Sequence, residues 1–471
     1  MTGNTAAVRQ ALSHLEIEDK PSILKRKSRD YYWFSPVLKA RMDHLQAEFI
    51  VCPRNENEVV EVLKACYQHE VPITTRGAGT GNYGQAMPLR GGIVMHMKNM
   101  DRVKEIHPGR VIVEPGCVMA ELDRQTREHS GQEQRMMPST YNTATIGGFI
   151  AGGSGGIGSC HWGALRDLGN ILRIRVATME PEPRFLDFTG EDLARVSHAY
   201  GTNGIITEIE MPLAPSYDWV EFAVTFDDFM RCTEFAYELA NQDGILCKLI
   251  TPIEAPIPGK FFKKFRGKVE EDKSICIVLV APHALDGFHA FLGRQGNPGI
   301  LYRSDEAESF ELEPGHLTEY TWNHTTLRAL QVDSSVTYLQ VRYGGPDPVA
   351  KVRRIREIFG AEVLQHLEVM RENGEVIFAG LPVVAFSTEE RLDEIVRIHE
   401  EEGCLIFNPH RYTLEEGGRQ KTDARQLKFK QEADPKGLLN PGKMISWDDP
   451  NFSYDQMYEY PHIQKPSEEA A

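Results

Sequence analysis

Apolar residues in the first half of the chain come in short runs separated by amphipathic and glycine-rich stretches. One amphipathic stretch, residues 56–70, places Val59, Val60 and Leu63 at the spacing of one helical face, which predicts a helix. A second helix is predicted for residues 118–129. Strands are predicted at 49–53, 71–75, 91–97, 110–116, 171–179 and 204–215. Because several strands follow one another without an intervening helix, this half is predicted to be α+β.

A second α+β unit is predicted from Tyr217 onward. Residues 220–226, 227–242 and 274–282 give the order strand, helix, strand, and 336–344, 349–374 and 375–384 repeat it. A domain boundary is therefore expected near residue 216. The expected units are an N-terminal extension (1–41), a first domain (42–216), a second domain (217–445) and a C-terminal tail (446–471).

Composition and charge narrow the class of protein. The 471 residues are more than one hydrophobic core normally serves, which favours two domains. A formal net charge of −16 argues against a partner that is duplex nucleic acid, because such proteins need clustered positive charge. No apolar run is long enough for a signal peptide or a membrane span, and the eight cysteines lack CxxC spacing. We therefore expect a cytoplasmic protein.

The stretch RGAGTGNYG, residues 76–84, contains the spacing GxGxxG, which is also the fingerprint of a Rossmann dinucleotide site. A Rossmann site needs a helix after the third glycine, yet only residues 85–91, with Pro88 among them, separate Gly84 from the next strand. That spacing argues against a parallel crossover. A P-loop is excluded because no Gly-Lys-Ser/Thr follows. A plain glycine-rich turn remains the alternative.

A second glycine-rich segment, residues 138–163, favours a ligand site over a plain turn. Glycine allows the backbone to approach a ligand closely, and two such loops can gather N–H groups around an anion. Arg76 could add charge to a phosphate, or it could be a solvated surface residue. Ser139, Thr143 and Thr145 could donate hydrogen bonds to a ligand, or they could stabilise turns. A pyrophosphate-containing ligand held between the two loops is favoured.

Five segments resemble, in order, those of the vanillyl-alcohol oxidase/p-cresol methylhydroxylase superfamily of FAD enzymes. The run PITTRGAGTGN (72–82) is similar to the family's pyrophosphate loop, and TATIGGFIAGGSGG (143–156) to its second flavin segment. EPGC (114–117) resembles the adenine-side turn, and YGTNGIITEIEMPL (200–213) the strand that ends the FAD domain. ADPKGLLNPGKM (433–444) resembles the segment that returns to the flavin.

The resemblance implies a two-subdomain FAD-binding domain followed by an α+β cap domain with an antiparallel sheet, the isoalloxazine lying between them. It implies FAD as cofactor, a small-molecule substrate, and oxygen or another acceptor that reoxidises the flavin. The residues implied in FAD binding are Arg76, Gly77, Ala78, Gly79, Thr80, Gly81, Asn82, Ser139, Thr143, Ala144, Thr145, Gly148, Ser154, Ile206 and Asn440.

Two departures from the family's patterns change the expectation. Some members tether FAD through a histidine where this chain has Thr80, and others add a cysteine where Tyr141 stands. Non-covalent FAD is therefore expected, although Cys160 and His161 lie nearby in the sequence. The metal segment GDGNxH of related D-2-hydroxy-acid dehydrogenases is missing, so no metal is expected and the hydroxy-acid interpretation is weakened.

Catalytic candidates come from the expected cap domain. His410 could be a base and Tyr412 an anion-stabilising donor, because the resemblance places a Tyr-Arg pair near here, whereas His410 could equally end a strand. His324 could face the flavin or lie at a helix start. Strand alternation puts Arg342 on one face with Tyr338 and Gln340, as a carboxylate or flavin partner or as a surface residue.

These residues indicate an FAD-dependent oxidase or dehydrogenase that oxidises a small alcohol or hydroxylated substrate by hydride transfer to flavin. Two alternatives stay open. One is an NAD(P)H-fed flavin reductase on the same FAD domain, and the other is a flavin-binding protein without catalysis.

Overall fold

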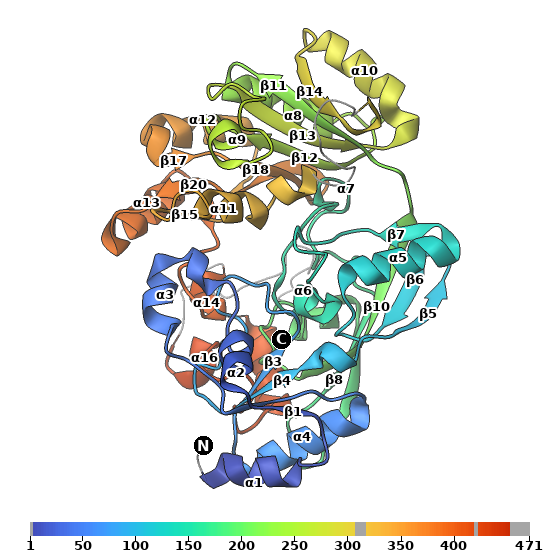
Figure 1. Ribbon diagram of the computed structural model, residues 1–471, viewed down its shortest axis with the longest axis vertical. Coiled ribbons are helices and arrows are strands. Elements are labelled where there is room, and N and C mark those ends of the chain that lie inside the picture. The colour runs from blue at the N-terminus through green and yellow to red at the C-terminus, as the bar shows by residue number, and fades with distance from the viewer. Residues whose placement is uncertain (1–2, 307–316, 419–422, 453–471) are drawn as a thin grey trace, which may run out of the picture.

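The computed structural model describes residues 3–306, 317–418 and 423–452. The amino-terminal half forms the lower part of the molecule in Figure 1, and the elements from β11 to α13 form the upper part. The red carboxy-terminal helices α14 (Leu414–Gly417) and α16 (Ile445–Asp448) return to the lower part. The expected α+β class with antiparallel sheets in the second half is confirmed.

The first sheet carries the glycine loop. Its order is β1 (Ile17–Glu18), β2 (Phe49–Val51), β4 (Ile93–His96), β3 (Ile73–Arg76). Helix α4 (Glu56–His69) contributes Val59 and Leu63 to the core under this sheet, as its periodicity predicts. Val62 is also in this core, whereas Val60, which the periodicity placed on the same face, is only half-buried. The Asn55 side chain accepts the N–H of Glu58 and so caps the start of the helix.

Strands β3 and β4 are parallel neighbours, which corrects the expectation from the loop's spacing. The whole connection, residues 77–92, is available for the crossover, whereas the expectation counted only the residues after Gly84. No helix forms between these two strands. The crossover is therefore made by the glycine loop itself, and this difference separates it from a Rossmann unit.

The second sheet has the order β5 (Val103–His107), β6 (Arg110–Val113), β10 (Ile205–Pro215), β8 (Arg173–Ala177), β9 (Phe185–Thr189), and β7 (Gln132–Gln134) pairs with β10. Helix α5 (Met119–Ser130), predicted from sequence over residues 118–129, lies against this sheet. The short helices α6 (Ile146–Gly152) and α7 (Ser159–Trp162) come from the second glycine segment.

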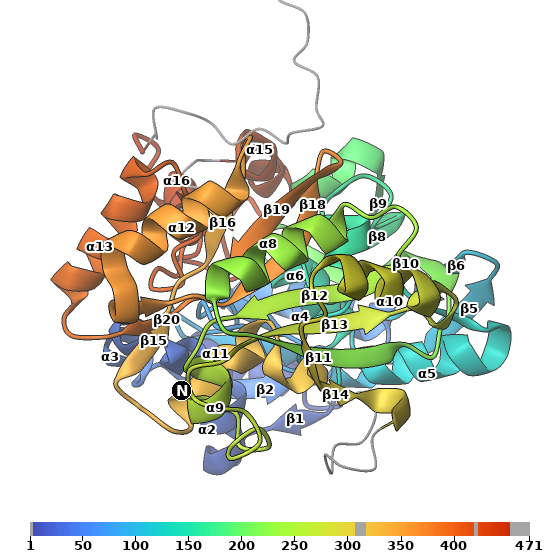
Figure 2. The same cartoon turned by 90° about the horizontal axis from the view of Figure 1, so that it is seen from above.

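The second half contains three antiparallel sheets. The first has the order β12 (Cys247–Ile253), β13 (Ser274–Val280), β11 (Val220–Phe226), β14 (Gly299–Arg303). Helices α8 (Phe229–Ala240) and α10 (Leu285–Arg294) cover one face of it (Figure 2). A small sheet has the order β15 (Val336–Tyr338), β20 (Val383–Ala385), β17 (Val363–Leu364).

The third of these sheets forms one wall of the site described below. Its order is β18 (Leu367–Glu372), β19 (Glu375–Gly380), β16 (Val341–Tyr343), β21 (Leu405–Ile406). The helix expected over 349–374 ends early: α12 spans Pro348–Phe359, and the following residues form β17 and β18. Gly360, with φ +49°, ends the helix because it adopts the left-handed region that favours glycine.

The remaining helices connect these layers. They are α1 (Gly3–Ala11), α2 (Pro21–Lys27), α3 (Pro36–Met42), α9 (Ile257–Phe261), α11 (Asn323–Leu330), α13 (Glu389–Glu401) and α15 (Ala424–Ala433). The expected boundary near residue 216 falls between β10 and β11, and its role as a domain boundary stays a prediction. Most of the expected tail, from residue 453 on, lies outside the described residues.

None of the described helices combines the length and the apolar character that crossing a bilayer requires. All eight cysteines are buried and free.

A hydrogen-bonded histidine joins the amino-terminal segment to the second half. The Nε2–H of His410 donates to the carbonyl of Tyr338 (2.8 Å), so Nδ1 accepts from the hydroxyl of Ser35 (2.7 Å). The Thr337 hydroxyl also donates to the carbonyl of Phe34 (2.9 Å). His410 is 1% exposed, and burial lowers its pKa to about 4. The ring is therefore neutral at pH 7 and holds three separate segments together.

This buried histidine predicts a pH dependence of stability. An unfolded chain binds a proton at His410 near its ordinary pKa of about 6.5, whereas the folded chain resists it until about pH 4. Stability should therefore fall as the pH is lowered from about 6.5 towards 4. Urea unfolding across this range should show a shallower decline for His410→Gln than for wild type, by up to about 1.4 kcal/mol per pH unit. A matching control is His44→Gln, because His44 is exposed. Equal slopes for both variants would contradict this role.

Candidate functional site

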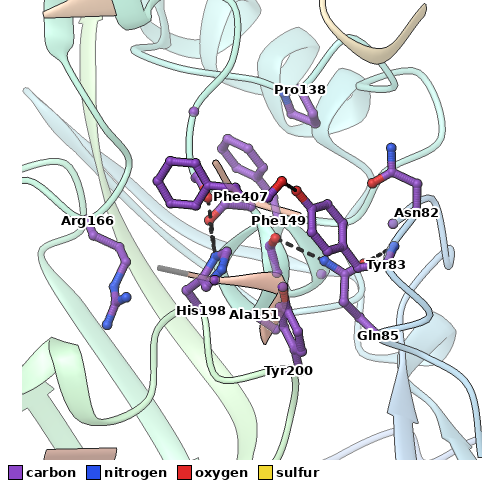
Figure 3. A pocket seen from close by; sticks show the side chains of 18 of the residues that line it. Asn82, Tyr83, Gln85, Pro138, Phe149, Ala151, Arg166, His198, Tyr200 and Phe407 are labelled. Carbon is purple, nitrogen blue, oxygen red and sulfur yellow. Dashed lines mark hydrogen bonds between the residues drawn. The ribbon is translucent and has the colours of Figure 1, made fainter. Parts of the chain in front are cut away.

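A cavity of about 390 Å³ lies between the two glycine segments and the β18–β19–β16 sheet. Figure 3 shows part of its lining, with Asn82 and Phe149 among the labelled side chains. The glycine loop after β3 supplies one wall, and the second glycine segment with Ile206 supplies another. Strands β16, β18 and β19 close it from the second half of the chain. Residues around Glu415 and Met444 add the carboxy-terminal segment. Four distant parts of the sequence therefore meet at one cavity.

Arg76 holds the glycine loop through hydrogen bonds from its side chain to backbone carbonyls. Its guanidinium donates to the carbonyl of Ala78 (2.8 Å) and to the carbonyl of Arg29. The side chain is buried, and burial lowers its pKa to about 10. Gly79 has φ +71°, and a Cβ at this position would lie 2.1 Å from Arg76 Nη2. Arg76 therefore fixes the loop's shape, and the loop requires glycine where it crosses the guanidinium.

The backbone N–H groups of the loop lack acceptors. Within the described part of the chain, none of the N–H groups from Gly77 to Asn82 donates to a protein atom. These residues all line the cavity. Residues 77–81 are half-buried and Asn82 is buried, so water or a ligand in the cavity can complete this row. Consecutive N–H groups form the concave donor surface that binds phosphate oxygens.

The second glycine segment faces this loop at close range. Thr145 caps α6 by accepting the N–H of Gly148 at its hydroxyl (3.3 Å). A Cβ on Gly77 would lie 2.0 Å from the same hydroxyl oxygen, so the two segments meet where Gly77 lacks a side chain. Together with the unpartnered N–H row, this geometry fits the diphosphate of a dinucleotide such as FAD.

The structure brings most of the predicted cofactor residues together. Those that line the cavity are Arg76, Gly77, Ala78, Gly79, Thr80, Gly81, Asn82, Ser139, Ala144, Thr145, Gly148, Ser154 and Ile206. Thr143 and Asn440 are not among the lining residues. Thr143 is exposed and donates to the carbonyl of Thr140 (3.2 Å), which is the turn-stabilising alternative. Whether each lining residue binds FAD stays a prediction.

Asn440 acts one layer behind the cavity. Its side-chain amide donates to the carbonyls of Gln85 (2.8 Å) and Tyr200 (2.6 Å), and both of those residues line the cavity. Its backbone N–H donates to the carbonyl of Ile73 in β3 (2.7 Å). Asn440 therefore fastens the carboxy-terminal segment to the glycine loop and to the segment before β10.

The four predicted catalytic residues lie in different surroundings. Arg342 lines the cavity. His410, Tyr412 and His324 do not line it. Both ring nitrogens of His410 are engaged in the contacts described above, and Tyr412 packs beside Met42 and Met87. His324 is buried in α11, and burial lowers its pKa. The geometry therefore favours structural roles for these three residues, and their catalytic roles stay predictions.

The predicted strand face of Tyr338, Gln340 and Arg342 divides between two sheets. β15 ends at Tyr338 and β16 begins at Val341. Gln340 and Arg342 line the cavity, whereas Tyr338 is fully buried outside it. Alternation over the whole run could not reveal this change of sheet.

Sequence reasoning missed Tyr83 and Glu372, which also line the cavity. The Tyr83 hydroxyl donates to the carbonyl of Phe407 (3.1 Å) and so joins the glycine loop to the second half (Figure 3). Glu372, at the end of β18, pairs with Arg342: the Nε of Arg342 donates to its Oε1 (3.0 Å). The position of Tyr83 within the glycine-rich stretch 76–84 was the available signal. Glu372 had none, because its partner is distant in sequence.

The side chains considered for a covalent flavin link lie away from this cavity. Cys160 and His161 line a separate cavity beside α8, and the thiol of Cys160 donates to the carbonyl of Cys247 (3.2 Å). Tyr141 is likewise not among the residues lining the main cavity. Thr80 lines it but offers only a hydroxyl.

Glu18, Cys52 and His96 place potential metal-ligating atoms within 4.8 Å of one another. Ammonium groups already contact two of them: Lys27 Nζ lies 3.3 Å from His96 Nε2, and Lys98 Nζ donates to Glu18 (2.8 Å). Burial lowers the pKa of His96 to about 3, and Lys27, Arg76 and Lys98 act in the same direction. A field that opposes a proton also opposes a metal cation, so this cluster is a poor metal site.

Residues 47–180 match the family model described as FAD binding domain. The glycolate oxidase subunit GlcD of Bacillus subtilis is 32% identical over 179 residues, which cover 35% of this chain and 37% of that protein. The mitochondrial D-2-hydroxyglutarate dehydrogenase of Rattus norvegicus is 26% identical over 223 residues, covering 44% and 40%. The matches thus span only about two fifths of these curated relatives.

Solved structures match over nearly the whole chain. Alkyldihydroxyacetonephosphate synthase superposes with a TM-score of 0.70 at 15% identity, covering 94% of this chain and 86% of that one. p-Cresol methylhydroxylase with bound substrate gives 0.67 at 14% identity, covering 96% and 97%. At such identities these likenesses show the fold alone. Together the comparisons show an FAD binding domain over residues 47–180 and a chain that shares the fold of these two structures.

Proposed function

We propose that this protein is an FAD-dependent oxidoreductase that oxidises a small hydroxylated substrate. The observation that carries the proposal is the cavity itself, with a row of unpartnered N–H groups on one wall and the β16–β18–β19 sheet on the other. Bound FAD supplies a hydride acceptor at such a site. The chain's own part is to bind the cofactor, exclude water and place the substrate's C–H bond against the ring.

The N–H groups of residues 77–82 would hold the diphosphate, and Thr145 would keep the facing segment at the required distance. Non-covalent binding is proposed because Thr80 stands at the tether position and neither Cys160 nor His161 lines this cavity. Asn440 would stabilise the loop without contacting the cofactor, through its bonds to Gln85 and Tyr200.

The names of the relatives support the substrate class. They include glycolate oxidase, D-lactate dehydrogenase and D-2-hydroxyglutarate dehydrogenase, and each named substrate is a 2-hydroxy acid. These matches cover less than half of this chain, so we propose a hydroxylated small molecule, with 2-hydroxy acids and phenolic alcohols to be tested first. Oxygen or another small acceptor would reoxidise the flavin, and the cytoplasm is the proposed location.

Glycine at position 79 should be required for FAD retention. Alanine there would meet the Arg76 guanidinium and would strain a backbone at φ +71°. Gly79→Ala should weaken FAD binding roughly tenfold or more, measured by FAD fluorescence on dilution. The matched control is Gly91→Ala, because Gly91 has φ +66° but a Cβ added there would have no atom within 4 Å. Similar FAD affinity in both variants would show that the contact with Arg76 does not matter.

The proposed activity predicts a yellow protein whose flavin is bleached by substrate without oxygen. Acid should release FAD, and an anaerobic screen of 2-hydroxy acids and alcohols should find compounds that reduce it. Addition of NADPH and NADH separates this activity from a flavin reductase. Rapid reduction by a nicotinamide alone would contradict the proposal, as would a flavin that no hydroxylated compound reduces.

A further inference from the structure

One charged pair on the wall formed by the β18–β19–β16 sheet joins the two strands that lie on either side of β19. Arg342 lies in β16 and Glu372 is the last residue of β18. Their contact is bidentate, with Arg342 Nε 3.0 Å from Glu372 Oε1 and Nη2 against Oε2. The side chains are 28% and 20% exposed, and both line the cavity. The pair is thus half-buried and reachable from the cavity.

The other carboxylates of the cavity wall hold backbone N–H groups in place. Asp30 accepts from Tyr32 (2.9 Å) and Ala86 (3.2 Å), so it fixes the segment beside the glycine loop. The remaining ones cap helix starts or turns: Asp167 accepts from Ala164, Asp423 from Arg425 and Gln426, and Glu415 from Ile445 and Ser446. Protonating any of these would weaken the local fold.

Glu372 differs because its bonding partner among the described residues is a side chain. A guanidinium can rotate with its side chain, whereas a backbone N–H cannot move without its segment. Of the histidines, His198 lines the cavity, and its Nδ1 already lies 3.0 Å from the carbonyl of Gly153. Glu372 is therefore the carboxylate on this wall that can take a proton without breaking a backbone contact.

Strand β18, which carries Glu372, lies against the second glycine segment. Met370, two residues earlier in β18, has its Cε 3.0 Å from the point that a Cβ on Gly155 would occupy. Residues two apart on a strand share a face, so Met370 and Glu372 point to the same side of the sheet. Trp322 also approaches Gly155, within 3.3 Å of that point. Substrate bound between these surfaces would lie beside Glu372.

We propose that Glu372 is the proton acceptor of the oxidation, and that Arg342 orients it. This inference rests on the proposed function. The substrate O–H bond breaks and its proton moves to a carboxylate oxygen of Glu372. The C–H bond breaks, and its hydrogen leaves with the electron pair to FAD, which is reduced as the substrate becomes a carbonyl compound. The acceptor that reoxidises the flavin removes the two electrons.

The test compares Glu372→Gln with Glu375→Gln in the FAD-loaded protein. Glu375 is exposed and lies opposite Glu372 in the β18–β19 register, so it matches the charge change on the same hairpin. With a substrate that reduces the wild type, Glu372→Gln should lower the limiting rate of anaerobic flavin reduction by about 100-fold or more. Its FAD content and substrate dissociation constant should stay close to wild type. If Glu372 takes the substrate proton, the wild-type rate should rise with pH as this carboxyl group loses its own proton. That rise should be lost in Glu372→Gln and kept in Glu375→Gln.

A second variant keeps the carboxylate at position 372 but shortens the side chain that carries it. Glu372→Asp should retain part of the rate and the rise with pH, and it serves as the test if Glu372→Gln loses FAD or fails to fold. An unchanged limiting rate in Glu372→Gln would overturn the proposal. So would weaker substrate binding with an unchanged limiting rate, because Glu372 would then bind substrate without taking its proton. If no hydroxylated compound reduces the wild type, the proposed function fails first and this inference falls with it.

Discussion

The constraint on which the candidate site depends is the row of backbone N–H groups in the glycine loop, which have no acceptor within the described protein. From Gly77 to Asn82 the backbone N–H groups have no protein acceptor in the described part of the chain, and these residues all line the cavity. A chain keeps such a row open only if a ligand or water completes it. Because this loop forms no helix or strand of its own, contacts with the surrounding side chains hold its conformation.

That support comes from four side chains, which belong to three separate parts of the sequence. Arg76 holds the loop from inside, through the carbonyls of Ala78 and Arg29. Thr145 meets it at Gly77, and the side-chain amide of Asn440 binds the carbonyls of Gln85 and Tyr200. The buried ammonium of Lys443 donates to the carbonyl of Gly84, and burial lowers its pKa to about 7. Removing any one support leaves polar atoms without partners, which costs more than the bond alone contributes.

The sequence predicted the local parts of this arrangement better than the distant contacts. The periodicity of α4 and the apolar runs of β2, β3 and β4 depend on neighbouring residues, and they were predicted correctly. The parallel pairing of β3 with β4 was missed because the glycine loop itself makes the crossover. The break after α12 depends on the conformation of one residue, Gly360, within an amphipathic run.

In the candidate site, too, local sequence patterns were easier to predict than contacts between distant residues. Glycine spacing pointed to the two segments that line the cavity, because glycine lets the backbone approach a ligand closely. It could not show that His410 is enclosed by Ser35 and Tyr338, since those contacts join three distant segments. The glycine spacing also could not show that the side chains of Arg342 and Glu372 meet across a sheet. The burial of a polar side chain and its hydrogen-bond partners depend on the folded structure. Together they determine which polar side chains can contact a ligand in the cavity.

The central claim is that the N–H row of residues 77–82 binds the diphosphate of FAD. Amide hydrogen exchange, compared between the FAD-loaded protein and the protein after FAD removal, tests it directly. The account predicts that exchange at these amides slows when FAD is bound, while amides of the distant strand β13 change little. Equal exchange at residues 77–82 with and without FAD would contradict it.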